Sequence, residues 1–552
     1  MSKNLSALAF RRGIDATLLE GFVQRAGEHG AVTPADAREL AESALIGEAV
    51  TLGAASFYDF LKAKRPPHRA RICNGTACLV TGRQAAVRQT LEAHLPPESI
   101  GSVCCLGRCH ENDAFEFEGL NYSNRSPEHI ATIVRASNGS PHTDTYAVGS
   151  NLTVPILTAP LPDLVDFYAP LGMMLQTPPD QLLAELQRSG LRGRGGAGFL
   201  VAAKWAACRA ASGSPKYILC NADEGDPGAY SDRYLLEQRP HAVLFGMLAA
   251  GIVTGATAGV LYVRAEYPEA CARIETALQE LAALGWQGDN LQGSGFSFRC
   301  KMIKGAGAYI CGEETALIAS VEGARPEPRV RPPFPTEVGL FGRPTVINNV
   351  ETLACIQPIF AQGGAAFARI GTRQSTGPKL TSLNALFRRP GVYEVAMGTS
   401  LRSVIDHLGG GLKVPVKALH IGGPLGGLVP RSMWDRLTFD FESFKANGFL
   451  LGHAGIVAIP ETFPMIEYLA HLFEFTAAES CGKCFPCRLG SKRGHELLEQ
   501  AAAGHRPIDR TLFADLLDTL EQGSLCALGG GLPMPIRNAL TYFADELKPY
   551  FA

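Results

Sequence analysis

Near the carboxyl end of this 552-residue chain, three cysteines follow a C-x2-C-x2-C spacing in E-S-C-G-K-C-F-P-C-R. They are Cys481, Cys484 and Cys487, and Cys526 follows in S-L-C-A-L-G. A cubane iron–sulfur cluster needs four thiolates, of which a tight loop opening a helix can supply three. Zinc is the alternative, although zinc sites usually use two separated C-x2-C pairs. We therefore predict a [4Fe–4S] cluster held by these four cysteines.

A second group of cysteines lies near the amino end. Cys73 and Cys78 are separated by four residues, and Cys105 and Cys109 by three. Two pairs of thiolates suit a [2Fe–2S] cluster, in which each iron takes one pair. Cys104 fits the spacing less well and is predicted to be a bystander. A zinc site or redox-active cysteines are the alternatives.

Between the two cysteine groups lies a glycine-rich segment, G-L-R-G-R-G-G-A-G-F, over residues 190–199. Bare backbone there can approach a phosphate or a flat ring, and Arg194 or Lys204 can offset negative charge. Taken alone, the segment could equally be a flexible turn, because no clear strand runs into it.

Three further motifs follow in the same region. C-N-A-D-E-G-D-P-G (220–228) comes directly after a predicted strand, where doubly wound sheets bind ligands. G-A-G-A-Y-I-C-G-E-E-T (305–315) and R-P-P-F-P (331–335) with I-N-N-V (347–350) complete the set. Each alone is more often structural, but their occurrence together favours a binding site.

The elements that must position these residues form an α/β multidomain pattern. Residues 1 to about 66 are predicted to be helical, including 35–45 and an aromatic stretch at 55–61. Strands are predicted at 69–73, 100–103, 114–118, 216–220 and 259–263, and helices at 83–95, 465–475 and 511–521. Residues 138–180 are rich in Ser, Pro, Thr and Asn and are predicted to be a linker or wrapping arm.

Composition excludes several classes of protein. Hydrophobic residues make up 46% and charged residues 19%, as in globular domains, and the net charge of −2 gives no reason to expect nucleic acid. We find no export signal, so we expect a cytoplasmic protein. The uncharged run 241–263 is long enough to span a membrane, but a buried helix, a turn and a core strand fit it better. We therefore expect no direct membrane insertion.

Residues 181–552 resemble the flavin-bearing NADH-oxidising subunit of respiratory complex I and its diaphorase relatives. The motifs GRGGAGF, CNADEGDPG, GAGAYICGEETAL, RPPFP, INNVETL and ESCGKCxPCRxG occur in the family's order. Residues 1–140 resemble the family's two-iron, thioredoxin-like partner subunit, here fused in front.

The resemblance implies six segments. They are an N-terminal helical segment (1–66), a thioredoxin-like [2Fe–2S] domain (67–140), a linker (141–180), a Rossmann-like FMN/NAD-binding domain (181–378), a β-grasp insert (379–457) and a helical-bundle [4Fe–4S] domain (458–552).

The resemblance also implies a set of residues that bind FMN and NAD(H). They are Gly193, Arg194, Gly195, Gly196, Ala197, Gly198, Phe199, Lys204, Asn221, Asp223, Glu224, Asp226, Tyr309, Gly312, Glu313, Glu314, Arg331, Phe334, Ile347, Asn348 and Asn349. Phe199 and Phe334 are expected against the NAD adenine.

The chain departs from the family at a few positions. Asp226 stands where glutamate is usual, Arg331 where lysine is usual, and Ala207 where an adenine-stacking aromatic is usual. Asp226 and Arg331 keep the sign of the charge, so NAD binding should persist. Aspartate is shorter than glutamate, so Asp226 should repel the 2′-phosphate of NADPH less, which weakens the expected preference for NADH.

The implied activity needs no side chain that transfers a proton. Flavin converts hydride exchange with nicotinamide into single-electron exchange with the clusters, so the protein binds and orients cofactors. We therefore predict no catalytic side chain in the proton-transfer sense.

The fusion resembles diaphorases of hydrogenases and formate dehydrogenases and disfavours ordinary complex I, where the two parts are usually separate subunits. The four front cysteines and the ending G-S-L-C-A-L-G-G (523–530) resemble the β subunit of NAD-dependent formate dehydrogenase. The expected partner is a catalytic α subunit with further iron–sulfur clusters. A diaphorase of an NAD-reducing [NiFe] hydrogenase, or a complex I module, is the alternative. A zinc-stabilised nucleotide-binding scaffold is the non-redox alternative.

Overall fold

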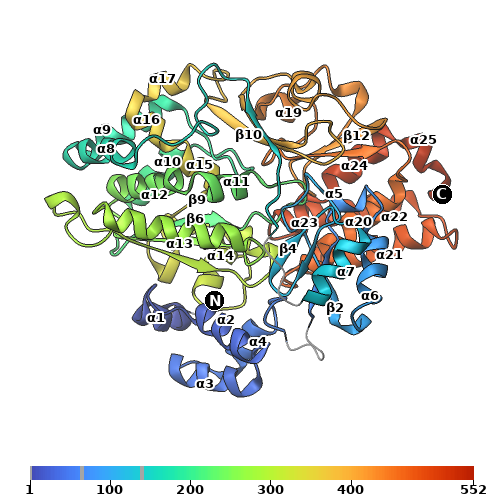
Figure 1. The fold of residues 1–552 in the computed structure, drawn as a ribbon, viewed down its shortest axis with the longest axis horizontal. Coiled ribbons are helices and arrows are strands. Elements are labelled where there is room, and N and C mark those ends of the chain that lie inside the picture. The colour runs from blue at the N-terminus through green and yellow to red at the C-terminus, as the bar shows by residue number, and fades with distance from the viewer. Residues whose placement is uncertain (1–2, 63–67, 137–141) are drawn as a thin grey trace.

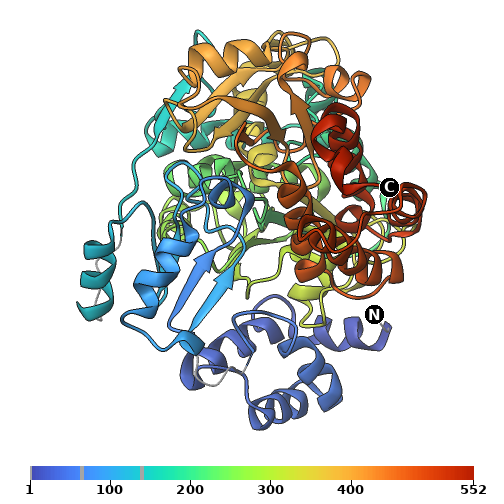
Figure 2. The same ribbon diagram turned by 90° about the vertical axis from the view of Figure 1, so that its right-hand side faces the viewer.

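The computed structural model describes residues 3–62, 68–136 and 142–552. The predicted boundaries at 66/67 and 140/141 lie outside these residues. Within the described residues, strands form three sheets, ordered β2-β1-β3-β4, β8-β7-β6-β9 and β13-β12-β14-β10-β11-β5. We call them the front sheet, the parallel sheet and the mixed sheet. Figures 1 and 2 show the helices α1–α4 at the foot of the molecule and the mixed sheet at the top.

The first helices cover one face of the parallel sheet. They are α1 (Lys3–Arg12), α2 (Leu18–His29), α3 (Pro34–Ala44) and α4 (Glu48–Ala55). Phe22 and Tyr58 pack in one core with Leu219 and Val260 of the sheet. Thr17 and Thr33 start α2 and α3 with capping boxes. The expectation of helix over 55–61 is wrong, because α4 ends at Ala55 and turns follow.

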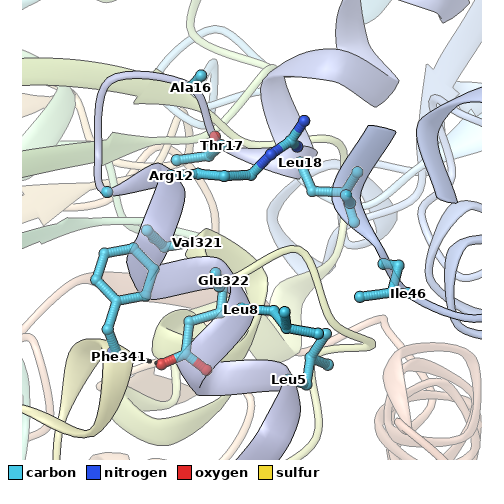
Figure 3. Close-up of a pocket in the computed structure, with 13 residues that line it drawn as sticks. Leu5, Leu8, Arg12, Ala16, Thr17, Leu18, Ile46, Val321, Glu322 and Phe341 are labelled. Carbon is cyan, nitrogen blue, oxygen red and sulfur yellow. Dashed lines mark hydrogen bonds between the residues drawn. The ribbon is translucent and has the colours of Figure 1, made fainter. Parts of the chain in front are cut away.

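The contact between these helices and the parallel-sheet region includes a buried carboxylate (Figure 3). The side chain of Glu322 is 2% exposed and accepts hydrogen bonds from the Phe341 N–H at 2.6 Å and the Ser6 hydroxyl at 3.3 Å. Burial raises the pKa of Glu322 to about 7. This acid is therefore part of the seam between α1 and the parallel-sheet region.

The front sheet lies beside these helices. Its elements are β1 (Ala70–Cys73), α5 (Thr76–Leu79), α6 (Gln84–Glu92), η1 (Pro97–Ser99), β2 (Ile100–Val103), β3 (Phe115–Phe117), β4 (Leu120–Tyr122) and α7 (Pro127–Ala136). Strand β1 pairs parallel to β2 and antiparallel to β3. The predicted strands are observed within two residues of their expected bounds.

The segment expected as a linker contains regular structure. Strand β5 (Ala147–Ser150) joins the edge of the mixed sheet, and α8 (Leu164–Gln176) packs in the main core through Phe167 and Leu171. Asp144 is held by Arg108, His110 and Arg233. The Ser- and Pro-rich composition of this segment did not predict β5 or α8, because both are stabilised by residues far away in the sequence, such as those of β11.

The parallel sheet contains β6 (Tyr217–Ala222), β7 (Ala258–Val263), β8 (Arg299–Lys304) and β9 (Thr345–Asn349). Its helices and short 3-10 turns are α9 (Pro179–Ser189), α10 (Val201–Ala210), α11 (Ser231–Gln238), α12 (Pro240–Thr254), α13 (Pro268–Ala283), η2 (Leu291–Gly293), η3 (Tyr309–Gly312), α14 (Glu314–Val321), η4 (Leu340–Gly342), α15 (Val350–Ala354), α16 (Ile356–Gln362) and α17 (Gly364–Ala368). Odd and even residues of β6 face opposite cores: Tyr217 and Leu219 pack with α1–α4, whereas Ile218 and Cys220 pack with α12.

The uncharged run 241–263 forms the buried helix α12, a turn and strand β7, as expected. Gly246 meets the Leu353 carbonyl of α15, where an added Cβ would lie 2.3 Å from its oxygen. Gly255 ends the helix in the left-handed conformation, at φ 78°. None of the helices in the described part of the chain combines the length and apolarity needed to cross a membrane.

The mixed sheet contains β10 (Pro378–Leu383), β11 (Gly391–Ala396), β12 (Val416–Ile421), β13 (Gly427–Pro430) and β14 (Ile456–Pro460), besides β5. The helical turns in this region are α18 (Leu401–Ser403), η5 (Val404–Leu408), η6 (Arg431–Met433) and α19 (Phe441–Ala446). This is the region of the predicted β-grasp insert, although β14 extends past its predicted end at 457.

The remaining residues are helical, as expected. The elements are α20 (Met465–Glu479), η7 (Pro486–Gly490), α21 (Ser491–Ala502), α22 (Arg510–Gly523), α23 (Ala527–Gly531), α24 (Pro533–Tyr542), α25 (Ala544–Leu547) and η8 (Lys548–Tyr550). The long C-terminal helices pack around a core that contains Phe473 and Phe513, whose ring centroids lie 6.0 Å apart.

Candidate functional site

The strand order of the parallel sheet creates a switch point between β6 and β9. From β6 the chain moves to β7 and then β8, and it returns to the other side of β6 at β9. All these neighbours pair in parallel, so their carboxyl ends share one edge. Ligands of doubly wound sheets bind outside the carboxyl ends at such a switch point.

A cavity of about 650 Å³ lies at this point, within the usual range for small-molecule sites. Asn221 of β6 and Asn348 of β9 both line it. Its wall includes sixteen of the predicted binding residues: Gly193, Gly195, Gly196, Ala197, Gly198, Phe199, Lys204, Asn221, Gly312, Glu313, Glu314, Arg331, Phe334, Ile347, Asn348 and Asn349.

The glycine-rich segment forms a closed loop in front of helix α10. The Gly193 N–H donates to the Phe199 carbonyl at 2.8 Å, and the backbones of Arg192 and Leu200 form an isolated antiparallel β-bridge. Gly196 has φ 128° and Gly198 has φ 62°, conformations that other residues rarely adopt. The loop therefore presents backbone to the cavity at the start of a helix, a suitable place for an anion.

Glu313 and Asn349 line the cavity and also start helices. The Glu313 carboxylate accepts the backbone N–H groups of Thr315 and Ala316 at the start of α14. The Asn349 side-chain oxygen accepts the Thr352 N–H at the start of α15. These caps fix both side chains at the cavity wall.

The charges in the cavity wall are balanced. The Glu314 carboxylate lies 2.7 Å from an Arg331 guanidinium nitrogen and 3.4 Å from Lys204 Nζ. Lys204 Nζ also donates to the Ile347 carbonyl at 3.1 Å. Phe199 and Phe334 are more than half exposed, so aromatic surface stands open beside these charges.

Five predicted binding residues lie outside the cavity wall: Arg194, Asp223, Glu224, Asp226 and Tyr309. The Arg194 guanidinium is buried against the Thr376 carbonyl. The Glu224 carboxylate accepts the N–H groups of Asp232 and Arg233, at the start of α11.

Of the other three, Asp223 and Tyr309 lie toward the front sheet, and Asp226 lies against His453 and Gly423 of the mixed-sheet region. Tyr309 donates its hydroxyl to Asp226 Oδ1 at 2.6 Å. Tyr309 and Asp223 line a small polar cavity together with Cys104 and Glu479. Burial raises the pKa of the Asp223 carboxyl well above its usual range. In this structure these residues brace the loop, and their binding role stays a prediction.

The front cysteines form two close pairs. The Sγ atoms of Cys105 and Cys109 lie 3.6 Å apart, and a hydrogen bond from the Cys78 thiol lowers the pKa of Cys73 to about 6. Backbone N–H groups of Gly75, Cys105 and Leu106 also favour the Cys73 thiolate. All four side chains are buried.

Cys104 is directed away from these pairs. It lines the small polar cavity with Glu479, and its carbonyl accepts a hydrogen bond from Arg264. Cys105 adopts a positive φ of 52°, which turns the chain between the two neighbouring cysteines.

The rear cysteines gather between α20 and α23. Cys481 and Cys487 share an apolar cluster with Phe475, and Cys484 and Cys526 pack against it. Burial raises the pKa of Cys487 to about 11 and that of Cys526 to about 12. Metal binding would therefore release protons from these thiols. Cys526 also lines the large cavity, so this cysteine group and the cavity share a wall.

The structure adds residues that the sequence motifs did not reveal. His453, in the loop before β14, places Nε2 3.2 Å from Asp226 Oδ2. Thr336, Thr345, Thr352 and Ala527 line the cavity. A histidine within G-H-A-G carries little signal by itself, because its partner lies far away in the sequence.

Comparison with known proteins identifies the regions. Family models match residues 15–138 (Thioredoxin-like [2Fe-2S] ferredoxin), 186–358 (Nuo51 FMN-binding domain) and 467–550 (NADH-ubiquinone oxidoreductase-F iron-sulfur binding region). The F 2 subunit of the NADH-quinone oxidoreductase of Rhizobium meliloti (strain 1021) is 43% identical over 374 residues, 67% of this chain and 88% of that protein.

The chain belongs to the family of NADH-quinone oxidoreductase F subunits.

Another F-family relative, NADP-reducing hydrogenase subunit HndC of Solidesulfovibrio fructosivorans, is 41% identical over 388 residues, 69% of this chain and 78% of that protein. The structure also resembles a chain of an NAD+-reducing [NiFe]-hydrogenase in the H2-reduced state, with a TM-score of 0.85 and 28% identity. That alignment covers 97% of this chain and 93% of the other. The predicted family and fold class are confirmed.

This F-family chain is thus a flavin and iron–sulfur oxidoreductase component with an FMN-binding domain, a [2Fe–2S] domain and a [4Fe–4S] region. The described residues fit these groups. The cavity has a glycine loop, a lysine and aromatic surface for a flavin nucleotide. Each cysteine group supplies four thiols, the donors that iron–sulfur clusters need.

Proposed function

We propose that this chain is the NAD-handling β subunit of a formate dehydrogenase complex located in the cytoplasm. In this role it exchanges hydride between NAD(H) and FMN, and it exchanges single electrons with its clusters. The observation that carries the redox part is the position of Cys526, a predicted cluster ligand that also lines the predicted nucleotide cavity.

The bound FMN would supply the chemistry, because flavin exchanges both hydride and single electrons. The chain's own residues bind and orient. The 193–198 loop offers backbone to the flavin nucleotide, while Phe199 and Phe334 offer surface for the adenine of NAD(H). Lys204, held by Glu314 and the Ile347 carbonyl, supplies positive charge at a fixed place.

The metal-ligating residues belong to this proposal. We assign the front cluster to Cys73, Cys78, Cys105 and Cys109. We assign the rear cluster to Cys481, Cys484, Cys487 and Cys526. Backbone N–H groups of Lys483 and Leu528 favour the thiolates of Cys481 and Cys526.

The choice of formate dehydrogenase rests on the presence of all four front cysteines and on the ending G-S-L-C-A-L-G-G (523–530). The fusion of the front and flavin-binding regions argues only against ordinary complex I. The second candidate is the diaphorase subunit of a hydrogenase. It is favoured by the similarity to the [NiFe]-hydrogenase chain over nearly the full length and to HndC.

Purification of the intact complex from its native cells tests the proposal. We expect molybdenum or tungsten in the complex, a catalytic α subunit, and NAD+ reduction that depends on formate. Nickel with NAD+ reduction that depends on hydrogen would establish the hydrogenase alternative. Zinc in place of iron, with no flavin, would refute the redox assignment.

A further inference from the structure

The loop that follows β6 connects the large cavity with the front cysteines. It leaves β6 just after Asn221, which lines the cavity, and it reaches Gly228, whose backbone N–H donates to the Sγ of Cys109 at 3.3 Å. Pro227 packs against Gly75 of the front cysteine loop, where an added Cβ would lie 3.2 Å away. A predicted ligand in the front domain thus receives a hydrogen bond from the parallel-sheet region.

The mixed sheet fixes both partners of this hydrogen bond. The Ser382 hydroxyl donates to the Gly228 carbonyl at 2.6 Å, and the Ala385 N–H donates to the Cys109 carbonyl at 2.9 Å. Both donors lie at the end of β10 and the turn after it. One short segment therefore holds the backbone on both sides of this contact, at Gly228, which donates, and at Cys109, which accepts.

Steric fit at Gly228 leaves little freedom. Gly228 has φ 96°, and an added Cβ would lie 2.6 Å from a Val457 methyl. A Cβ at Gly455 would lie 2.7 Å from the Gly228 oxygen and 2.9 Å from Ser382 Oγ. Ser382 and Cys109 are 1% and 3% exposed, so water does not compete for the hydrogen bond.

We propose that Ser382 is a positioning residue that, through the backbone of Gly228, raises the reduction potential of the front cluster. This inference rests on the ligand assignment proposed above. Reduction adds negative charge to a cluster, and hydrogen bonds to its sulfurs and exclusion of solvent set its potential. The N–H of Gly228 favours the more negative, reduced state.

The test compares two adjacent residues of β10 in the full chain with its clusters. Ser382→Ala removes the hydroxyl that holds Gly228. Thr381→Val is the matched control, because the Thr381 hydroxyl donates to the Ala454 carbonyl at 2.7 Å and is equally buried. Potentiometric EPR gives the midpoint of each cluster. Pulsed EPR of protein labelled with ¹⁵N-glycine reports the glycine nitrogens coupled to the front cluster.

We expect Ser382→Ala to lower the reduced-to-oxidised ratio of the front cluster, at the wild-type midpoint, about three- to tenfold, where tenfold corresponds to about 59 mV for a one-electron couple. The rear midpoint should stay unchanged, and one glycine nitrogen coupling should weaken. Thr381→Val should change neither cluster.

A weaker glycine coupling with an unchanged front midpoint would overturn the proposed effect on potential. An unchanged coupling and midpoint in Ser382→Ala would overturn the positioning role of Ser382. An equal shift of the front-cluster midpoint in Thr381→Val would also overturn the positioning role of Ser382. If the wild type shows no front-cluster signal at all, the ligand assignment fails instead, which is a distinguishable result.

Discussion

The imidazole of His453 contacts the carboxylate of Asp226 across two regions of the fold, with Nε2 3.2 Å from Oδ2. The Gly455 N–H donates to His453 Nδ1 at 3.0 Å, so Nδ1 is the acceptor and the proton is assigned to Nε2, facing the acid. With the Tyr309 hydroxyl on the other oxygen, Asp226 is held from both sides.

This contact predicts the effect of His453→Ala. Asp226 is a predicted NAD-binding residue, so loss of the imidazole that contacts its carboxylate should raise the KM for NADH about three- to tenfold, from roughly 1 kcal/mol of lost polar contact, while kcat changes less than about twofold. Steady-state dye reduction measures both constants. Exposed His505→Ala is the control. Equal KM values in the two variants would contradict the expectation.

The separation of Cys104 from Cys105 predicts opposite results for neighbouring substitutions. Cys105→Ser should lose the front EPR signal and lower iron from about six to about four atoms per chain. Cys104→Ser should keep both, since its side chain lies in the small polar cavity. Iron analysis of protein purified without oxygen decides the matter, and the reverse pattern would show that the ligand was misassigned.

Cys526→Ser should act on both the rear cluster and the cavity. We expect about two irons per chain, a retained front signal, and weaker flavin retention because Cys526 lines the cavity. Cys271→Ala, at a buried cysteine of α13 outside both predicted ligand sets, should keep about six irons and full flavin. A rear signal that survives in Cys526→Ser would refute its role as ligand.

Glu322 should make the docking of α1 dependent on pH. Burial raises its pKa from 4.5 to about 7, so between these values the folded protein holds more protons than the unfolded chain. Stability from this group is therefore present at pH 5 and is lost as pH rises through 7, by about 1 to 3 kcal/mol.

Hydrogen exchange of α1, corrected for the intrinsic rate at each pH, measures this loss. Protection should fall between pH 5 and 8 in the wild type and stay nearly level in Glu322→Gln. A parallel fall in both proteins would assign the pH effect to other groups.

Local patterns predicted the elements that carry their own signal. The strand expected at 216–220 is observed as Tyr217–Ala222, because apolar residues recur on both of its faces. The cysteine spacings predicted two groups. The structure places Cys105 beside Cys109 and gathers the rear cysteines around one apolar cluster, while their role as ligands stays a prediction. Residues 56–61 were expected to be helical because of their aromatic pattern, but Tyr58 and Leu61 instead reach the core from turns.

Local sequence patterns could not predict contacts between residues far apart in the chain. The pairing of His453 with Asp226 depends on how the mixed sheet packs on the parallel sheet, and no spacing in the sequence encodes it. The motif residue Glu224 was expected to bind a cofactor. In the fold its carboxylate accepts backbone N–H groups at the start of α11, a contact that no motif could reveal, and its binding role stays a prediction.

The packing of α1–α4 against the parallel sheet has a consequence for synthesis of the chain on the ribosome. These helices emerge before the parallel sheet, and their core partners extend to Ile347. At roughly 5 to 20 residues per second, the apolar faces of the helices would wait about 15 to 60 seconds for the strands that cover them. The nascent amino-terminal segment is thus an expected client of chaperones that shield apolar surface until β9 has been made.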